Sequence, residues 1–126
     1  DFSYLWHYIP WDENTIVNTL KNEYGWEAEP DSRQTWRTDD GTSPFYNYIY
    51  RTVGGFTEND TFRSNQIREG IMTRDEAFRL VQEENKPRTK AMKWYFDAVN
   101  LDQDKVLAAV DAIPKHYDPS VPLYKE

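Results

Sequence analysis

Apolar residues recur at steps of three and four along most of this chain, and this spacing constrains its fold more than any other feature. It places apolar side chains on one face of an α-helix. No segment longer than a few residues alternates like a half-buried strand, and there is no internal repeat. The sequence therefore predicts a mainly α fold. The predicted inward stripes include Ala77, Leu80 and Val81; Ala91, Met92, Tyr95, Phe96 and Val99; and Val106, Leu107, Val110 and Ile113.

Residues that begin and end helices divide the chain into short segments. Asp12 and Thr73 are typical N-caps, and Glu76 forms a capping box with Thr73. Gly25 and Pro114 are typical stops. These signals predict a small orthogonal bundle of about five short helices, with a long aromatic loop after the first. The expected helical segments are 13–24, 44–53, 74–84, 88–99 and 103–113, with about two further turns between 57 and 70, capped by Thr57 or Asp60.

The chain of 126 residues is long enough for one domain with a modest core. We expect a single helical domain over residues 1–126, with residues 115–126 as a flexible tail. No apolar run approaches the ~20 residues that cross a bilayer, so no membrane insertion is expected. The chain begins at Asp1 without an initiating Met or a signal pattern, which indicates a fragment of a longer protein.

Charge and cysteine content exclude several classes of function. A formal net charge of −7 opposes binding to phosphate backbones, so nucleic acid is not an expected partner. The absence of cysteine excludes disulfides, thiolate nucleophiles and thiolate zinc sites within this stretch. His7 and His116 show no metal-ligand spacing, and no protein-bound metal is expected, with one alternative left open, in which the paired Asp39 and Asp40 help to hold Mg²⁺.

The segment 26–42 has no helical apolar repeat and is longer than most loops in compact domains. Within it, Trp36, Arg37, Asp39 and Asp40 combine a ring, a fixed cation and two carboxylates, a set that can bind a charged or polyhydroxylated ligand. The alternative is an ordinary solvated turn, because Asp-Asp-Gly is a common turn composition. By contrast, Trp94, Tyr95 and Phe96 are expected to pack within the bundle.

A second polar group comprises Arg63, Ser64, Asn65 and Arg68. Two guanidinium groups near a helix start are a plausible phosphate clamp in an otherwise acidic chain. The alternative is that the arginines neutralise neighbouring acids, which are Glu58, Asp60 and Glu69. A nucleophile elbow and a phosphate-binding glycine loop are both missing from the sequence, which indicates that this chain alone is not a complete enzyme.

Several segments together resemble the C-terminal region of the bacterial N-acetyl sugar amidotransferases, which act in surface-polysaccharide and flagellin-sugar biosynthesis. The likeness runs from about Tyr8 to Tyr117. The segments that carry it are Tyr8-Ile9-Pro10-Trp11-Asp12-Glu13, Thr35-Trp36-Arg37-Thr38-Asp39, Phe45-Tyr46-Asn47-Tyr48-Ile49-Tyr50, and Gly55-Phe56-Thr57 continuing through Ser64-Asn65-Gln66-Ile67-Arg68-Glu69-Gly70 to Thr73-Arg74-Asp75-Glu76-Ala77.

The resemblance implies a cytoplasmic, ATP-dependent enzyme of the PP-loop ATP-pyrophosphatase type, acting in O-antigen and lipopolysaccharide biosynthesis. Such an enzyme activates the N-acetyl oxygen of a nucleotide-linked sugar and lets ammonia from a separate glutaminase displace it, which gives an acetamidino group. The family's ATP-binding loop and cysteine cluster are absent from this chain. ATP and Mg²⁺ are therefore expected mainly outside it, and the chain alone is expected to be inactive.

The same resemblance implies a set of substrate-binding residues on the sugar-nucleotide side of the active site. Arg37 and Arg68 are expected opposite phosphate. Some family members have Cys where this chain has Asp40, which weakens any catalytic role for that residue. The full set is Trp36, Arg37, Asp39, Asp40, Asn47, Tyr50, Arg63, Ser64, Asn65, Arg68 and Glu69.

Two other functions remain open at this point. The chain can instead be an interaction domain that docks the synthetase onto its glutaminase or onto itself. A carbohydrate-binding module is the third alternative. The helical pattern argues against it, because such modules are usually β-sandwiches.

Overall fold

A computed structural model describes residues 2–27 and 42–123. The chain divides into two units, Asp1–Thr38 and Asp39–Glu126, which are described separately below. The expectation of one domain over residues 1–126 stays a prediction. Within the described residues, no helix has both the length and the apolar character needed to span a membrane.

The first unit contains a short 3-10 turn, η1 (Leu5–His7), and helix α1 (Glu13–Tyr24). The Asp12 carboxylate accepts a hydrogen bond from the Thr15 backbone N–H at 2.7 Å, which caps the start of α1. Gly25 ends the helix in the left-handed conformation, with φ of 65°. Both ends of α1 therefore lie where the cap residues predict them.

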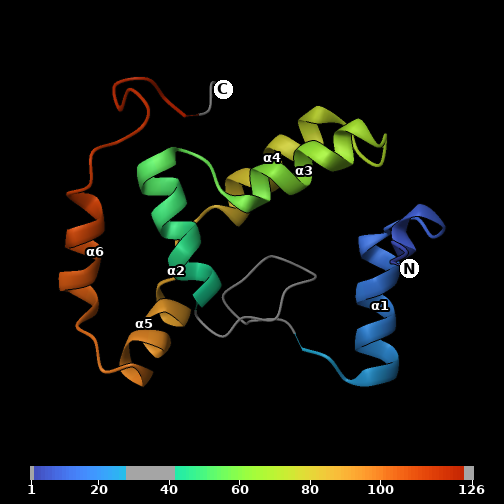
Figure 1. The fold of residues 1–126 in the computed structure, drawn as a ribbon, viewed down its shortest axis with the longest axis horizontal. Helices are drawn as coiled ribbons and strands as arrows, with labels where there is room; N and C mark the ends of the chain where they lie inside the picture. Colours follow the sequence, from blue (N-terminus) through green and yellow to red (C-terminus); the bar gives the residue numbers. More distant parts are fainter. Residues whose placement is uncertain (1, 28–41, 124–126) are drawn as a thin grey trace. The chain divides into compact units, whose positions relative to one another are not determined.

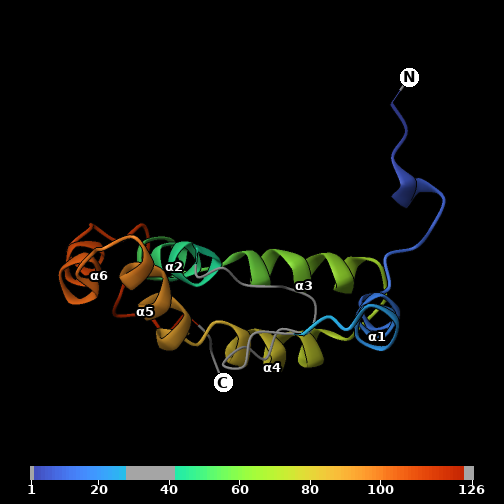
Figure 2. The ribbon, with the colours of Figure 1, turned by 90° about the horizontal axis from the view of Figure 1, so that it is seen from below.

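The second unit contains all the other helices of the described residues (Figure 1). Helices α3 and α4 pair with each other, whereas α2 and the π-helical turn η2 that extends it pack with α5 and α6. Figure 2 shows α3 and α4 running side by side. The described residues form six α-helices and no strand, which confirms the mainly α prediction. The bounds are α2 (Thr42–Ile49), η2 (Tyr50–Gly54), α3 (Glu58–Arg68), α4 (Arg74–Glu84), α5 (Thr89–Ala98) and α6 (Gln103–Asp111).

The most deeply buried apolar side chains of this unit lie on α5. Met92 and Phe96 are both 0% exposed. The Phe96 ring packs edge-to-face against Phe45 of α2, with ring centroids 4.9 Å apart. These contacts bury the helical stripe predicted for residues 88–99 along most of its length. The other buried apolar residues of the unit are Ala77, Val81, Ala91 and Val110.

Four residues predicted to point inward are instead substantially exposed: Leu80, Trp94, Val99 and Ile113. Val99 and Ile113 lie beyond the last residues of α5 and α6, so the stripes stop before they reach them. Trp94 lies beside the buried stripe of α5 and not on it. A short helix that is covered on one face leaves such positions in solvent.

The third helix is longer than the two turns predicted. Thr57 accepts a hydrogen bond from the Asn59 backbone N–H at 3.0 Å, and the Asp60 carboxylate accepts one from the Thr57 backbone N–H at 2.8 Å. The two candidate caps therefore act together as one capping box, and α3 begins at Glu58.

Candidate functional site

The α3–α4 cleft is a hollow of about 800 Å³ between these two helices. A volume of this order is typical of small-molecule sites. One part of its lining is polar and cationic, with Ser64 and Arg68 of α3 and Arg74 of α4. Another part is apolar, with Phe78 and Val81 of α4. The rest of the lining consists of Asp60, Arg63, Ile67, Asp75, Ala77 and Leu123.

Helical geometry explains which side chains reach this cleft. Residues four apart lie on the same face of a helix, as Asp60, Ser64 and Arg68 do on α3. On α4, Arg74, Phe78 and Val81 lie at steps of four and three. Pairing these two faces brings Arg68 and Arg74, which are close to the turn between the helices, to the lining of one cleft.

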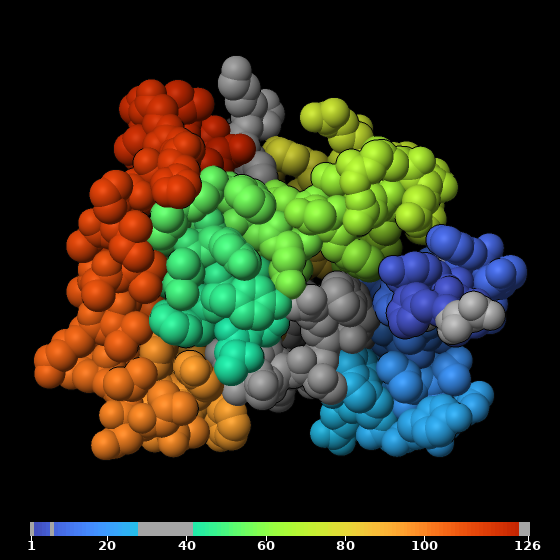
Figure 3. All heavy atoms as spheres, viewed as in Figure 1, coloured from blue at the N-terminus to red at the C-terminus, as the bar shows by residue number. Residues whose placement is uncertain are grey.

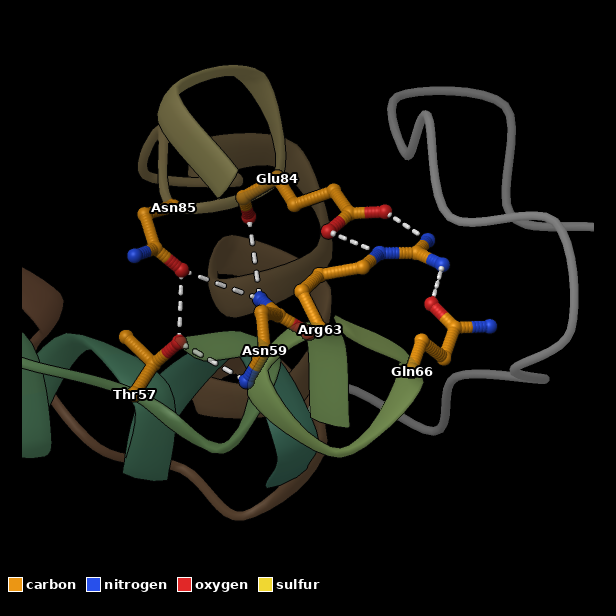
Figure 4. Close-up of polar contacts among 6 residues, drawn as sticks. All are labelled: Thr57, Asn59, Arg63, Gln66, Glu84 and Asn85. Carbon is orange, nitrogen blue, oxygen red and sulfur yellow. Dashed lines mark hydrogen bonds and ion pairs between the residues drawn. The ribbon is translucent and has the colours of Figure 1, made fainter. Parts of the chain in front are cut away.

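Arg63 also lines the cleft, but its charge is already balanced inside the protein (Figure 4). Its side chain is 5% exposed, and that of its ion-pair partner Glu84 is 3% exposed. The Arg63 Nε donates to Glu84 Oε2 at 3.1 Å, and Nη1 donates to Gln66 Oε1 at 2.7 Å. The arginine therefore joins α3 to α4. Neutralisation is one of the two predictions for this arginine, and the structure shows it, but the acid is Glu84 of α4, which is not among the acids predicted.

Uncharged side chains continue this network along the hairpin of α3 and α4 (Figure 4). Asn59 donates to Asn85 Oδ1 at 3.1 Å, and Thr57 donates to the same oxygen. Asn85 in turn donates to Asp60 Oδ2 at 2.8 Å. Because the Asp60 carboxylate also caps α3, it is committed to structure, although it lies at the edge of the cleft.

The structure divides the remaining candidates on α3 into two groups. Ser64, which is half-buried, and Arg68, which is exposed, line the cleft. Asn65 is exposed and accepts a hydrogen bond from Arg68 Nη2 outside the cleft lining. Glu69 is the C-cap of α3 and is also exposed. Of the positions predicted on α3, only Ser64 and Arg68 therefore combine access to the cleft with a side chain that can reach a ligand.

Asn47 and Tyr50 lie away from the α3–α4 cleft. Asn47 is buried and donates to Glu58 Oε1 at 3.2 Å, which ties α2 to the start of α3. Tyr50 is 51% exposed, and its ring is nearly parallel to that of Phe56, with centroids 6.5 Å apart. The structure thus does not bring these two candidates together with Ser64 and Arg68.

Asn47 lines a second, smaller hollow of about 290 Å³, which Tyr48, Glu84 and Arg88 also border. Burial raises the pKa of Tyr48, and the hydrogen bond that its hydroxyl donates to Asp111 at 2.8 Å raises it further, as does the negative charge of that carboxylate. Tyr48 is therefore a neutral hydrogen-bond donor near pH 7 and not a base.

Trp36, Arg37, Asp39 and Asp40 lie outside the described residues. Within the described residues, no group of three His, Asp or Glu side chains could hold a metal ion. Arg74 was missed by sequence reasoning as a ligand-binding candidate. The available signal was its place as first residue of a well-capped helix, but only the pairing with α3 brings it to the cleft.

Comparison of the chain with protein-family models, with curated proteins and with solved structures gives no match.

Proposed function

We propose that this chain is the C-terminal region of an ATP-dependent amidotransferase that converts the N-acetyl group of a nucleotide-linked sugar into an acetamidino group. The parent enzyme would act in the bacterial cytoplasm, in the biosynthesis of lipopolysaccharide O-antigen or other surface polysaccharide. The chain would supply the α3–α4 cleft as the part of the substrate site that holds phosphate.

The observation that carries this proposal is the shared lining of one cleft by Ser64, Arg68 and Arg74. Two of these residues are among the positions selected by the sequence resemblance, and Arg74 lies within a motif that carries it. Guanidinium groups bind phosphate through paired N–H donors, and a serine hydroxyl can add a further donor. In a chain with net charge −7, an anion is attracted only where cations gather locally.

The apolar part of the cleft adds to this fit. Ile67, Phe78 and Val81 line the same cleft as Arg68 and Arg74. A nucleotide-linked sugar presents both kinds of surface, because its phosphates are anionic and its rings have apolar faces. The cleft therefore offers contacts to an organic group as well as to the phosphate that carries it.

ATP, Mg²⁺ and a glutaminase partner belong to the parent enzyme in this proposal. ATP would activate the N-acetyl oxygen, and ammonia from the glutaminase would displace it. The contribution of this chain in this proposal is binding and orientation of substrate, and the chain alone is expected to be inactive.

The test is to substitute Arg68→Gln and Arg74→Gln separately in the parent enzyme. A hydrogen bond to a charged group is worth about 1.5–3 kcal/mol, so each change should raise KM for the nucleotide-linked sugar about tenfold or more, with a smaller effect on kcat. Arg79→Gln is the matched control, because Arg79 is exposed on α4 and lines a different hollow. Unchanged KM in both cleft variants would overturn the phosphate assignment.

A docking domain is the second candidate, and exposed apolar residues at the end of α5 favour it. Trp94 is 62% exposed, Leu101 51% and Val99 45%. Large apolar side chains that are left in solvent are available for association with another protein. If Trp94→Ala abolishes glutaminase binding while Arg68→Gln and Arg74→Gln leave KM unchanged, docking is the function of this chain.

A further inference from the structure

The C-terminal strap, residues 114–123, leaves α6 and runs along the end of η2 (Figure 3). The His116 backbone N–H donates to the Val53 carbonyl at 2.8 Å, and the Tyr117 hydroxyl donates to the Thr52 carbonyl at 3.3 Å. Carbonyl groups at the end of a helix have no partner within the helix. The strap therefore supplies donors to two carbonyl groups at the end of η2.

Gly55 allows the strap to approach this closely. A Cβ atom at Gly55 would lie 2.9 Å from Leu123 Cδ2, which is closer than such atoms pack, and 3.0 Å from Tyr117 Cδ1, which is tighter than most such contacts. The residue also has φ of 82°, which glycine adopts without strain. Tyr117 and Leu123 thus both pack on the glycine at the end of η2.

The same strap reaches the α3–α4 cleft. Leu123, at the far end of the strap, lines the cleft together with residues of both helices. Helices α3 and α4 otherwise pack mainly on each other, while η2 packs with α2 and α6. The strap therefore links the hydrogen bonds of η2 at one end to the wall of the cleft at the other.

We propose that the C-terminal strap is a latch for the α3–α4 cleft, so that a phosphate ligand in the cleft and a seated strap stabilise each other. This inference rests on the proposed function only in assuming that the cleft binds phosphate. Leu123 is 37% exposed and lines the cleft, so a ligand that occupies the cleft would cover it further. Few bonds hold the strap and much of it is exposed, so its opening costs little free energy and occupancy of the cleft can change it.

The first measurement uses NMR to monitor hydrogen exchange at the His116 amide. It is made on the 126-residue chain with and without inorganic pyrophosphate. His116 is not part of the cleft lining, so slower exchange there reports seating of the strap and not direct contact. We expect pyrophosphate to slow this exchange severalfold. Leu123→Ser should abolish the slowing, whereas Val121→Ser, an exposed change in the same strap, should preserve it.

The second measurement uses the reciprocity of coupled equilibria. If the ligand stabilises the seated strap, a change that loosens the strap must weaken binding of the ligand. Tyr117→Ala removes the contact with Gly55 and the bond to Thr52, at a residue outside the cleft lining. It should weaken pyrophosphate binding severalfold, an effect that a passive wall would not produce. Tyr117→Phe, which removes only the hydroxyl, should give a smaller effect of the same sign if Tyr117→Ala does not fold.

The outcomes separate the latch from the phosphate site itself. Pyrophosphate binding with unchanged or faster exchange at His116 would overturn the latch and leave the phosphate site standing. Unchanged affinity in both Tyr117 variants would also overturn it. Failure of the wild-type chain to bind pyrophosphate would overturn the coupling together with the phosphate assignment.

Discussion

Arg63 and Arg68 are close in the sequence but lie on different faces of α3. Helical geometry places residues five apart at about 140° around the axis, so these two arginines cannot share one face of α3. Arg63 accordingly points to Glu84 and is buried, whereas Arg68 is exposed beside Ser64. Arg68 with Ser64 was predictable from the spacing alone. The partner of Arg63 was not, because Glu84 comes near only when α3 and α4 pair.

This buried ion pair should dominate the stability of the α3–α4 hairpin. Removing one partner strands a charge in the interior, so Glu84→Ala should lower the free energy of unfolding by about 3–5 kcal/mol, measured by urea titration. Glu83→Ala is the control, because that carboxylate is exposed and pairs with Lys86 on the surface. Its cost should stay within about 1 kcal/mol. Equal costs for the two changes would contradict the structural role given to Arg63.

Helix ends were predictable wherever the signals are local. Thr73 and Glu76 set the start of α4, and Asp12 sets that of α1, because each cap bonds residues within a single turn. The π-helical turn η2 gave no such signal. Two of its carbonyl groups bond to the C-terminal strap, more than sixty positions along the chain, and a local pattern contains no information on such contacts.

The capping box of α4 predicts a specific pH dependence. The hydroxyl of Thr73, followed by its backbone N–H, holds the pKa of Glu76 below its ordinary value. Because the folded pKa lies below the unfolded one, the cap contributes stability above the unfolded pKa and loses it as the pH falls through the folded pKa. Thr73→Ala should therefore raise the pKa of Glu76 toward its ordinary value, measured by NMR titration of the side chain.

An internal control for that titration lies on α6. Hydrogen bonds from the backbone and side chain of Lys105 lower the pKa of Asp102, and Thr73 has no part in them. Asp102 should titrate identically in the wild-type chain and in Thr73→Ala. A Glu76 pKa that does not move would mean that the hydroxyl bond is absent in solution.

At the scale of the whole molecule, spacing predicts the core only in part. The stripe that contains Met92 and Phe96 is buried as its spacing predicts. Leu80, Val99 and Ile113 are predicted inward by the same kind of spacing, yet they are substantially exposed, as is Trp94. The mainly α class thus followed from periodicity, whereas the α3–α4 cleft depends on how two helices pair, which periodicity does not specify.

The core of the second unit is small, so the loss of one buried ring should have a large effect on stability. Phe96→Ala should lower the free energy of unfolding by about 3–5 kcal/mol, because the ring is fully buried against Phe45. Since domains are stable by only about 5–15 kcal/mol, this single change should lower the urea midpoint by at least about a fifth. Trp94→Ala deletes a larger ring two positions away and should cost less than about 1 kcal/mol, because that ring is mostly in solvent. A large loss from Trp94→Ala would show that the ring packs in solution, and the surface at the end of α5 would then cease to be a candidate for docking.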